Sequence, residues 1–178
     1  MGDYKEQLEE FNANITSIID ESVRELSMTF DKLYDERKIK DIPTAIKTAE
    51  ALLPLDYNMP TKMQIYYDIA NAFHDLRVIE GIDEEHCLEK EIYHLRCALD
   101  LYEKNYYGDE SDSAETKVAQ YIAMRSYTNL GNAYQAIGRY IVAIDCLQNA
   151  VIISNDFSMA SLNLSLLLFR YAHLQIKD

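Results

Sequence analysis

Hydrophobic residues recur at steps of three and four along most of the 178-residue chain, and this spacing predicts amphipathic helices rather than strands. The first pattern, from Leu8 to Leu33, predicts one long helix from about Asp3 to Lys38. A short helix is expected at Asp41-Ile42-Pro43, because Asp is a common N-cap residue and Pro fits the first helical turn. Pro54 is expected to end it. These patterns predict an all-α fold.

The rest of the chain contains two segments that align with each other. Y-Y-D-I-A-N-A-F at residues 66–73 matches Y-T-N-L-G-N-A-Y at residues 127–134, so each is expected to begin a pair of helices. An acidic loop at residues 81–85 is expected to separate the two helices of the earlier pair. Residues 105–115 are acidic and Ser-rich without an apolar period, and they form the clearest expected loop.

A last helix is predicted from about Met159 to Gln175. In it, Leu164, Ser165 and Leu168 match the Leu, small-residue and Tyr places of the segment at residues 127–134. The chain would then consist of about three and a half helical pairs, with insertions that make the spacing between pairs irregular.

The stretch Y-T-N-L-G-N-A-Y-Q-A-I-G-R-Y-I-V-A-I-D-C-L-Q-N-A, Tyr127 to Ala150, resembles one complete tetratricopeptide repeat (TPR). Gly131 and Ala143 would be small because two helices approach closely where they cross. The resemblance implies a solenoid of helical hairpins. Residues 1–40 would form a long N-terminal helix that acts as a cap or arm, and residues 41–178 the TPR-like repeat domain. The best repeat would span 124–157, and a half repeat 158–178.

Composition narrows the function. The net charge of −13 argues against a general affinity for nucleic acid or an anionic membrane. Three scattered cysteines are too few for a disulfide framework, and the acidic N-terminus has no apolar run, so a cytoplasmic location is expected. No phosphate-binding loop, nucleophile elbow or zinc-protease motif is present, and the chain is expected to be no enzyme and to carry no cofactor. His94 and Cys97 share adjacent helical turns, but two ligands do not make a structural zinc site.

The TPR resemblance also implies where a ligand binds, since the first helix of each pair lines a concave groove in that family. The expected function is therefore the binding of a protein or peptide, with basic segments favoured by the acidic chain. An Asn side chain both donates and accepts, which suits capture of a peptide backbone. The expected groove residues are Tyr67, Asn71, Thr128, Asn129, Asn132 and Asn163. A regulator that senses a small peptide is a further possibility that the sequence does not favour.

The last predicted helix is apolar on more than one face, and residues 118–178 carry only three acids and four bases. Exposed apolar surface of this kind marks an interaction site. Three explanations are open: a further domain follows Asp178, the helix forms a homodimer interface, or the N-terminal helix folds back over it. The expected junction or dimer residues are Leu162, Leu166, Leu167, Phe169 and Leu174.

The C-terminal stretch N-D-F-S-M-A-S-L-N-L-S-L-L-L-F-R-Y-A is also similar, over about 50 residues, to TPR regions that precede HEPN-type RNase domains in bacteria. This resemblance implies an alternative function, the regulatory or sensor domain of a larger effector in stress or antiviral defence. The Arg–His spacing of that RNase family is absent here, so any nuclease activity would belong to another domain.

Overall fold

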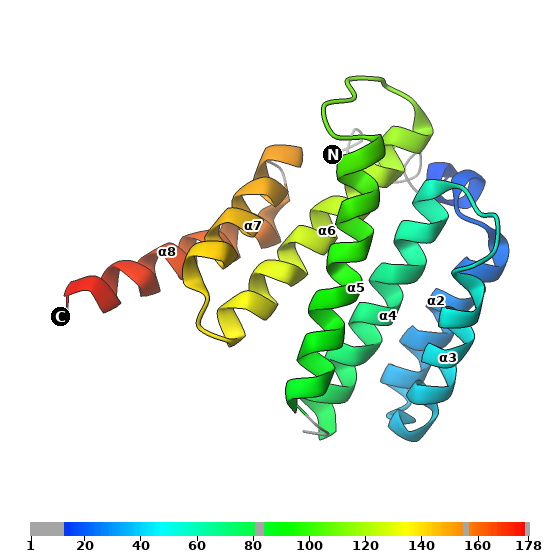
Figure 1. Cartoon of the computed structure of the whole chain (residues 1–178), viewed down its shortest axis with the longest axis horizontal. Helices are drawn as coiled ribbons and strands as arrows, with labels where there is room; N and C mark the ends of the chain where they lie inside the picture. The colour runs from blue at the N-terminus through cyan, green and yellow to red at the C-terminus, as the bar shows by residue number, and fades with distance from the viewer. Residues whose placement is uncertain (1–12, 81–83, 155–156, 177–178) are drawn as a thin grey trace, which may run out of the picture.

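The computed structural model describes residues 13–80, 84–154 and 157–176. These residues form helices joined by short connections, with no strand among them (Figure 1). The all-α prediction is therefore confirmed for the described part of the chain. Within these ranges, no helix is both long and apolar enough to cross a membrane.

Consecutive helices pack against each other in pairs, and the pairs follow one another across the molecule (Figure 1). The first described pair is α2 with α3, the second α4 with α5, and the third α6 with α7; α8 follows and packs on α7 and α6. Their bounds are α2 Glu21–Asp35, α3 Ile42–Leu52, α4 Met59–Glu80, α5 Glu84–Asn105, α6 Ala114–Ala136, α7 Tyr140–Ile153 and α8 Ser158–Ile176, with a 3₁₀ turn, η1, at Ile39–Asp41.

The single N-terminal helix expected from Asp3 to Lys38 is wrong in its described part. Residues 13–18 are helical, the chain breaks at Ile19 and Asp20, and α2 begins afresh at Glu21. Asp20 caps α2 by accepting from the backbone N–H of Ser22 at 3.0 Å. The carbonyl of Ile18 instead accepts from Asn58 Nδ2 at 2.7 Å. An apolar stripe continues across such a break, so periodicity alone did not reveal it. Residues 1–12 of the expected helix lie outside the described residues.

The acidic insertion after α4 is also shorter than expected. Glu84 and Glu85 form the first turn of α5, where carboxylates interact favourably with the helix dipole. Gly81 to Asp83 lie outside the described residues. The second expected loop is present between α5 and α6, and Ser113 caps α6 by accepting from Thr116 N at 3.0 Å.

The crossing of α6 and α7 is as close as the sequence predicts. A Cβ atom built on Gly131 would lie 2.8 Å from Leu147 Cγ and 3.2 Å from the carbonyl oxygen of Ala143. Ala143, Leu147 and Ala150 on α7 are fully buried there. Only glycine at 131 allows α7 to pack so closely against α6 without displacing Leu147.

The packing face of α8 has the same register as that of α6. Ala160 and Leu167 are fully buried, whereas Ser165 and Leu168 are exposed. Ala160 and Leu167 correspond to the buried Ser126 and Ala133 of α6, 34 positions earlier. Ser165 corresponds to Gly131, which faces the second helix of its own pair, and the predicted half repeat has no second helix, so the exposure of Ser165 and Leu168 agrees with that prediction. Leu167 is buried and so drops out of the expected junction surface.

The fold-back explanation for α8 is contradicted over the described residues. The segment around Ile18 and Asp20 is bonded to Asn58 and Thr61 at the start of α4, and α2 packs on α3 and α4. None of these elements covers α8.

Candidate functional site

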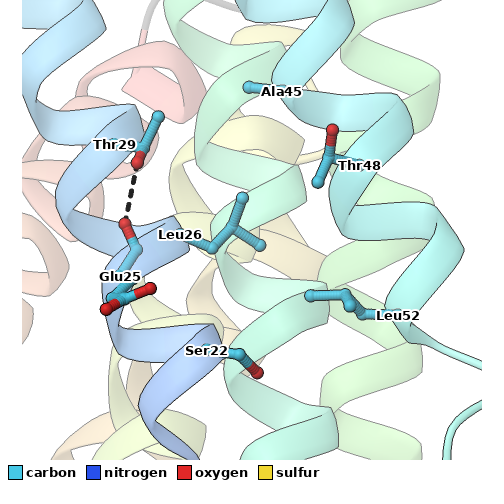
Figure 2. Close-up of a pocket in the computed structure, with 7 residues that line it drawn as sticks. All are labelled: Ser22, Glu25, Leu26, Thr29, Ala45, Thr48 and Leu52. Atoms are coloured by element: carbon cyan, nitrogen blue, oxygen red, sulfur yellow. Dashed lines mark hydrogen bonds between the residues drawn. The ribbon is translucent and has the colours of Figure 1, made fainter.

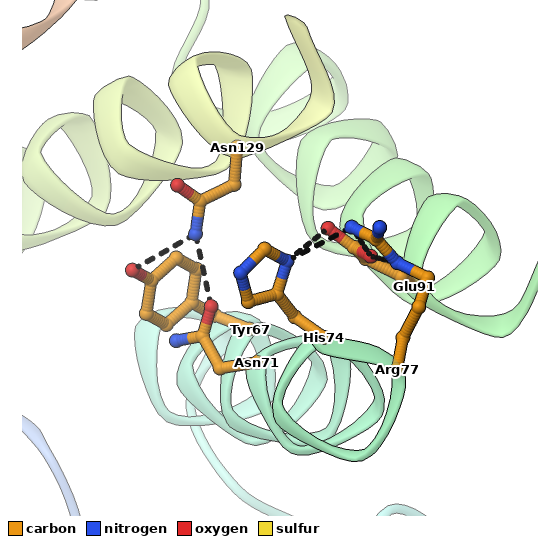
Figure 3. Close-up of polar contacts among 6 residues, drawn as sticks. All are labelled: Tyr67, Asn71, His74, Arg77, Glu91 and Asn129. Carbon is orange, nitrogen blue, oxygen red and sulfur yellow. Dashed lines mark hydrogen bonds and ion pairs between the residues drawn. The ribbon is translucent and has the colours of Figure 1, made fainter. Parts of the chain in front are cut away.

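Two pairs of asparagine side chains connect neighbouring first helices. Asn129 on α6 donates from Nδ2 to Asn71 Oδ1 on α4 at 2.9 Å, and the same nitrogen lies 3.3 Å from Tyr67 Oη (Figure 3). Asn163 on α8 donates to Asn132 Oδ1 on α6 at 3.1 Å. Four of the six predicted groove residues therefore meet in two pairs, one between α4 and α6 and one between α6 and α8.

The helical repeat explains this arrangement. Tyr67, Asn71 and His74 lie at steps of four and three on α4, so they share one face that points toward α6 and α5 (Figure 3). Arg125, Asn129 and Asn132 have the same spacing on α6. The two faces lie side by side because α4 and α6 pack directly against each other.

Two predicted groove residues do not line an open surface. Thr128 is buried, and its hydroxyl donates to the carbonyl of Met124 at 2.9 Å. Tyr67 is buried as well, and its ring packs in the core while its hydroxyl reaches Asn129. Asn71, Asn129 and Asn163 are partly exposed, and Asn132 is exposed. The accessible part of the predicted groove thus consists of the four asparagines.

Arg125, which is not among the predicted groove residues, belongs to the same face. Its guanidinium carbon lies 4.4 Å from the centre of the Tyr67 ring and 5.3 Å from that of Tyr121. Stacking on aromatic faces holds a guanidinium in place while its N–H groups remain able to donate. The signal that could have identified it is its position four residues before Asn129.

Buried carboxyl groups lie on the α2 side of α4. Asp68 is buried, and it accepts from Ser27 on α2 and from Gln64 Nε2 at 2.8 Å. Burial raises the pKa of Asp68 to about 7, against the opposing effect of those hydrogen bonds. Burial likewise raises the pKa of Asp75 to about 6, and the neighbouring charge of Asp31 adds to the increase.

A buried ion pair joins the other end of α4 to α5. Glu91 is buried, and its Oε2 accepts from Arg77 Nε at 3.3 Å and Nη2 at 3.2 Å (Figure 3). His74 Nδ1 lies 3.1 Å from the other carboxylate oxygen, Oε1. Sequence analysis did not find this cluster, because Glu91 occurs in a run of charged residues typical of a solvated face. The cluster orients His74, whose side chain is half exposed beside Asn71.

The histidines and cysteines considered as metal ligands have other surroundings. His94 is buried and stacks on Phe73, with ring centres 5.9 Å apart and an interplanar angle of 11°. Cys87, Cys97 and Cys146, all of them described, form no disulfide. In the ranges that the structure describes, no three His, Cys, Asp or Glu side chains gather as a metal site would require.

A shallow hollow between α2 and α3 is the other feature of interest (Figure 2). Its apolar lining comes from Leu26, Ala45 and Leu52. Its hydroxyl groups already have partners: Thr29 donates to the carbonyl of Glu25 at 2.8 Å, Thr48 to that of Thr44 at 3.1 Å, and Ser22 to Asp20 Oδ1 at 2.6 Å. A ligand site needs convergent polar groups, and this hollow lacks them.

Comparison with known proteins does not assign this chain to a family. No protein-family model matches this chain, and no curated protein matches it. The class of molecule rests on its own residues: an all-helical chain with paired helices and a polar face on α4 and α6.

Proposed function

We propose that this chain is a non-catalytic, TPR-like interaction module that binds an extended peptide segment of a partner protein. The peptide lies along the face formed by α4, α6 and α8. The observation that carries this proposal is the two asparagine pairs, Asn71 with Asn129 and Asn132 with Asn163.

The chemistry of an amide pair supports peptide binding. Each asparagine has one carbonyl oxygen and one NH₂ group, and the bond within a pair uses one donor and one acceptor. Asn71 keeps its NH₂ group and Asn129 keeps its carbonyl oxygen for a ligand. If the amide oxygen and nitrogen are swapped in both side chains, the pair still leaves one NH₂ group and one carbonyl oxygen for a ligand. A peptide backbone, which also has one N–H and one C=O per residue, is the matching ligand.

The charges favour a partner segment with basic residues. The net charge of −13 gives long-range attraction for such a partner and speeds encounter. Arg125 stacks on Tyr67, whose hydroxyl contacts Asn129, and its guanidinium is placed to meet a carbonyl oxygen of the peptide.

The test is selection of peptides from a random displayed library on the 178-residue chain, followed by affinity measurement for the best peptide. The double substitution Asn71→Ala with Asn132→Ala removes one member of each pair. It is expected to weaken binding at least tenfold while the helical circular dichroism is unchanged. Asn105→Ala is the matched control, because Asn105 Nδ2 only contacts the carbonyl of Leu101 on its own helix. Equal affinity of the double variant and the control would reject the groove.

A further inference from the structure

A row of large apolar side chains is exposed on α8, on the side opposite its packing face. Met159, Leu162, Leu166 and Phe169 are 56%, 59%, 50% and 73% exposed. We call these four residues the α8 seam. Ala160 and Leu167, which bury α8 against the preceding pair, lie on the other side of the helix. Figure 1 shows the C-terminal half of α8 extending beyond the last helix pair.

The spacing of the α8 seam indicates what kind of element covers it. Its members follow one another at steps of three, four and three residues, which is the a/d spacing of helices that pack side by side. Small residues at steps of seven, Ser158, Ser165 and Ala172, run along one edge of the seam. They leave room for a neighbouring helix to approach. The surface therefore fits a second α-helix rather than an extended strand.

The charge distribution indicates which helix. Residues 1–117 carry 27 acids and 13 bases, whereas α8 carries no Asp or Glu and has only Arg170 and His173 as basic residues. Contact through the surfaces of residues 1–117 would bring two strongly acidic bodies together. Contact through α8 joins the neutral parts of two copies and keeps their acidic parts apart, which limits repulsion.

The seam is also complementary to itself. We propose that α8 pairs with α8 of a second copy, antiparallel and about a two-fold axis level with Leu164. In antiparallel packing an a residue meets a d residue of the other helix. Leu162 then meets Leu166 of the second copy, and Met159 meets Phe169 of the second copy. Each pair occurs twice by symmetry, which is the isologous contact of a C₂ dimer.

The size of this interface sets the expected strength. Four half-exposed side chains per copy, with the small flanking residues, form a contact near the lower limit of about 1,000–1,200 Å² for specific interfaces. The dimer is expected to form at micromolar concentration and to dissociate on dilution. It uses a face of α8 that the proposed peptide groove does not, so either proposal can fail without the other.

Sedimentation velocity of the full chain at increasing concentration is the first test. The mass is expected to rise from 20.6 kDa toward twice that value. Leu162→Glu is expected to remain monomeric at every concentration, since it places a charge in two layers of the interface. Val78→Glu is the matched control: Val78 on α4 is also 59% exposed, and this variant is expected to dimerise as the original chain does.

Orientation is tested with two complementary variants. Met159→Glu and Phe169→Lys chains are each expected to dimerise more weakly than the original. A mixture of the two is expected to form a heterodimer more tightly than either alone, because antiparallel pairing places the new Glu opposite the new Lys. A monomeric original chain, a dimer that persists in Leu162→Glu, or a mixture no tighter than its components would overturn the proposal. A monomeric original chain would assign the seam to a helix of another protein.

Discussion

Gly131→Ala tests how closely α6 and α7 cross. The added Cβ would lie 2.8 Å from Leu147 Cγ, 3.1 Å from Leu147 Cδ2 and 3.2 Å from the carbonyl oxygen of Ala143. The first two contacts involve a fully buried side chain, and the third involves backbone that moves only with α7. The new methyl group therefore forces Leu147 out of its present position.

Two opposing effects set the magnitude. Alanine is favoured over glycine inside a helix by about 1 kcal/mol, whereas overpacking a core costs about 1–3 kcal/mol. Gly131→Ala should therefore lower the free energy of unfolding by about 0–2 kcal/mol in the original chain. When Leu147→Ala is already present, the Leu147 clash is gone. The same change should then raise the free energy of unfolding by about 0–1 kcal/mol, because the 3.2 Å contact with the Ala143 carbonyl oxygen remains.

Urea unfolding of the original chain, both single variants and the double variant measures this reversal. The cycle is expected to give a coupling energy of about 1–3 kcal/mol between positions 131 and 147. Gly138→Ala is the control. Its cost comes from a φ of 74°, and nothing lies within 4 Å of its added Cβ, so that cost should be the same with or without Leu147. Equal effects of Gly131→Ala in both backgrounds would refute the close crossing.

Three further predictions concern buried polar groups, and each is tested by measuring unfolding in urea. For the first two, the measurement is repeated at several pH values. Burial raises the pKa of Asp68 to about 7, so the folded chain keeps a proton that the unfolded chain releases. The free energy of unfolding should therefore fall as pH rises from about 4 to 7. Asp68→Asn should remove this loss, and an unchanged pH dependence in that variant would contradict the prediction. Burial, assisted by the charge of Lys90, lowers the pKa of His94 to about 4, so the free energy of unfolding should fall as pH drops from about 6.5 to 4. His94→Leu should abolish this loss at low pH. A variant that loses as much stability in acid as the original chain would refute the prediction. Arg77→Met leaves the buried Glu91 without its cation and should lower the free energy of unfolding by about 3–5 kcal/mol. Most of this loss should be restored when Glu91→Gln is added. If the double variant is no more stable than Arg77→Met, Arg77 acts through packing alone.

Local patterns explain why much of the fold was predictable. The small residues Gly131 and Ala143 indicated a close helix crossing before any coordinates, because no larger residue fits there. The break before α2 was not predictable in the same way. It depends on Asp20 and on Asn58, two residues 38 positions apart in the sequence, and the apolar stripe continues across it.

The candidate site was likewise predictable in part. The repeat alignment placed Asn71, Asn129, Asn132 and Asn163 on first helices, and the structure brings them together in pairs. The alignment does not give the burial of the neighbouring positions, because that depends on how the helices pack. That is why Thr128 is buried on its own helix instead of lining the groove.

The central claim is that a peptide binds along α4 and α6. The most direct measurement is to record amide chemical-shift changes by NMR when the selected peptide is added to the isotope-labelled chain. The account predicts the largest changes at Asn71, Arg125, Asn129 and Asn132, with His74 next to them. Changes confined to α3, α5 and α7, or to the exposed seam of α8, would contradict it.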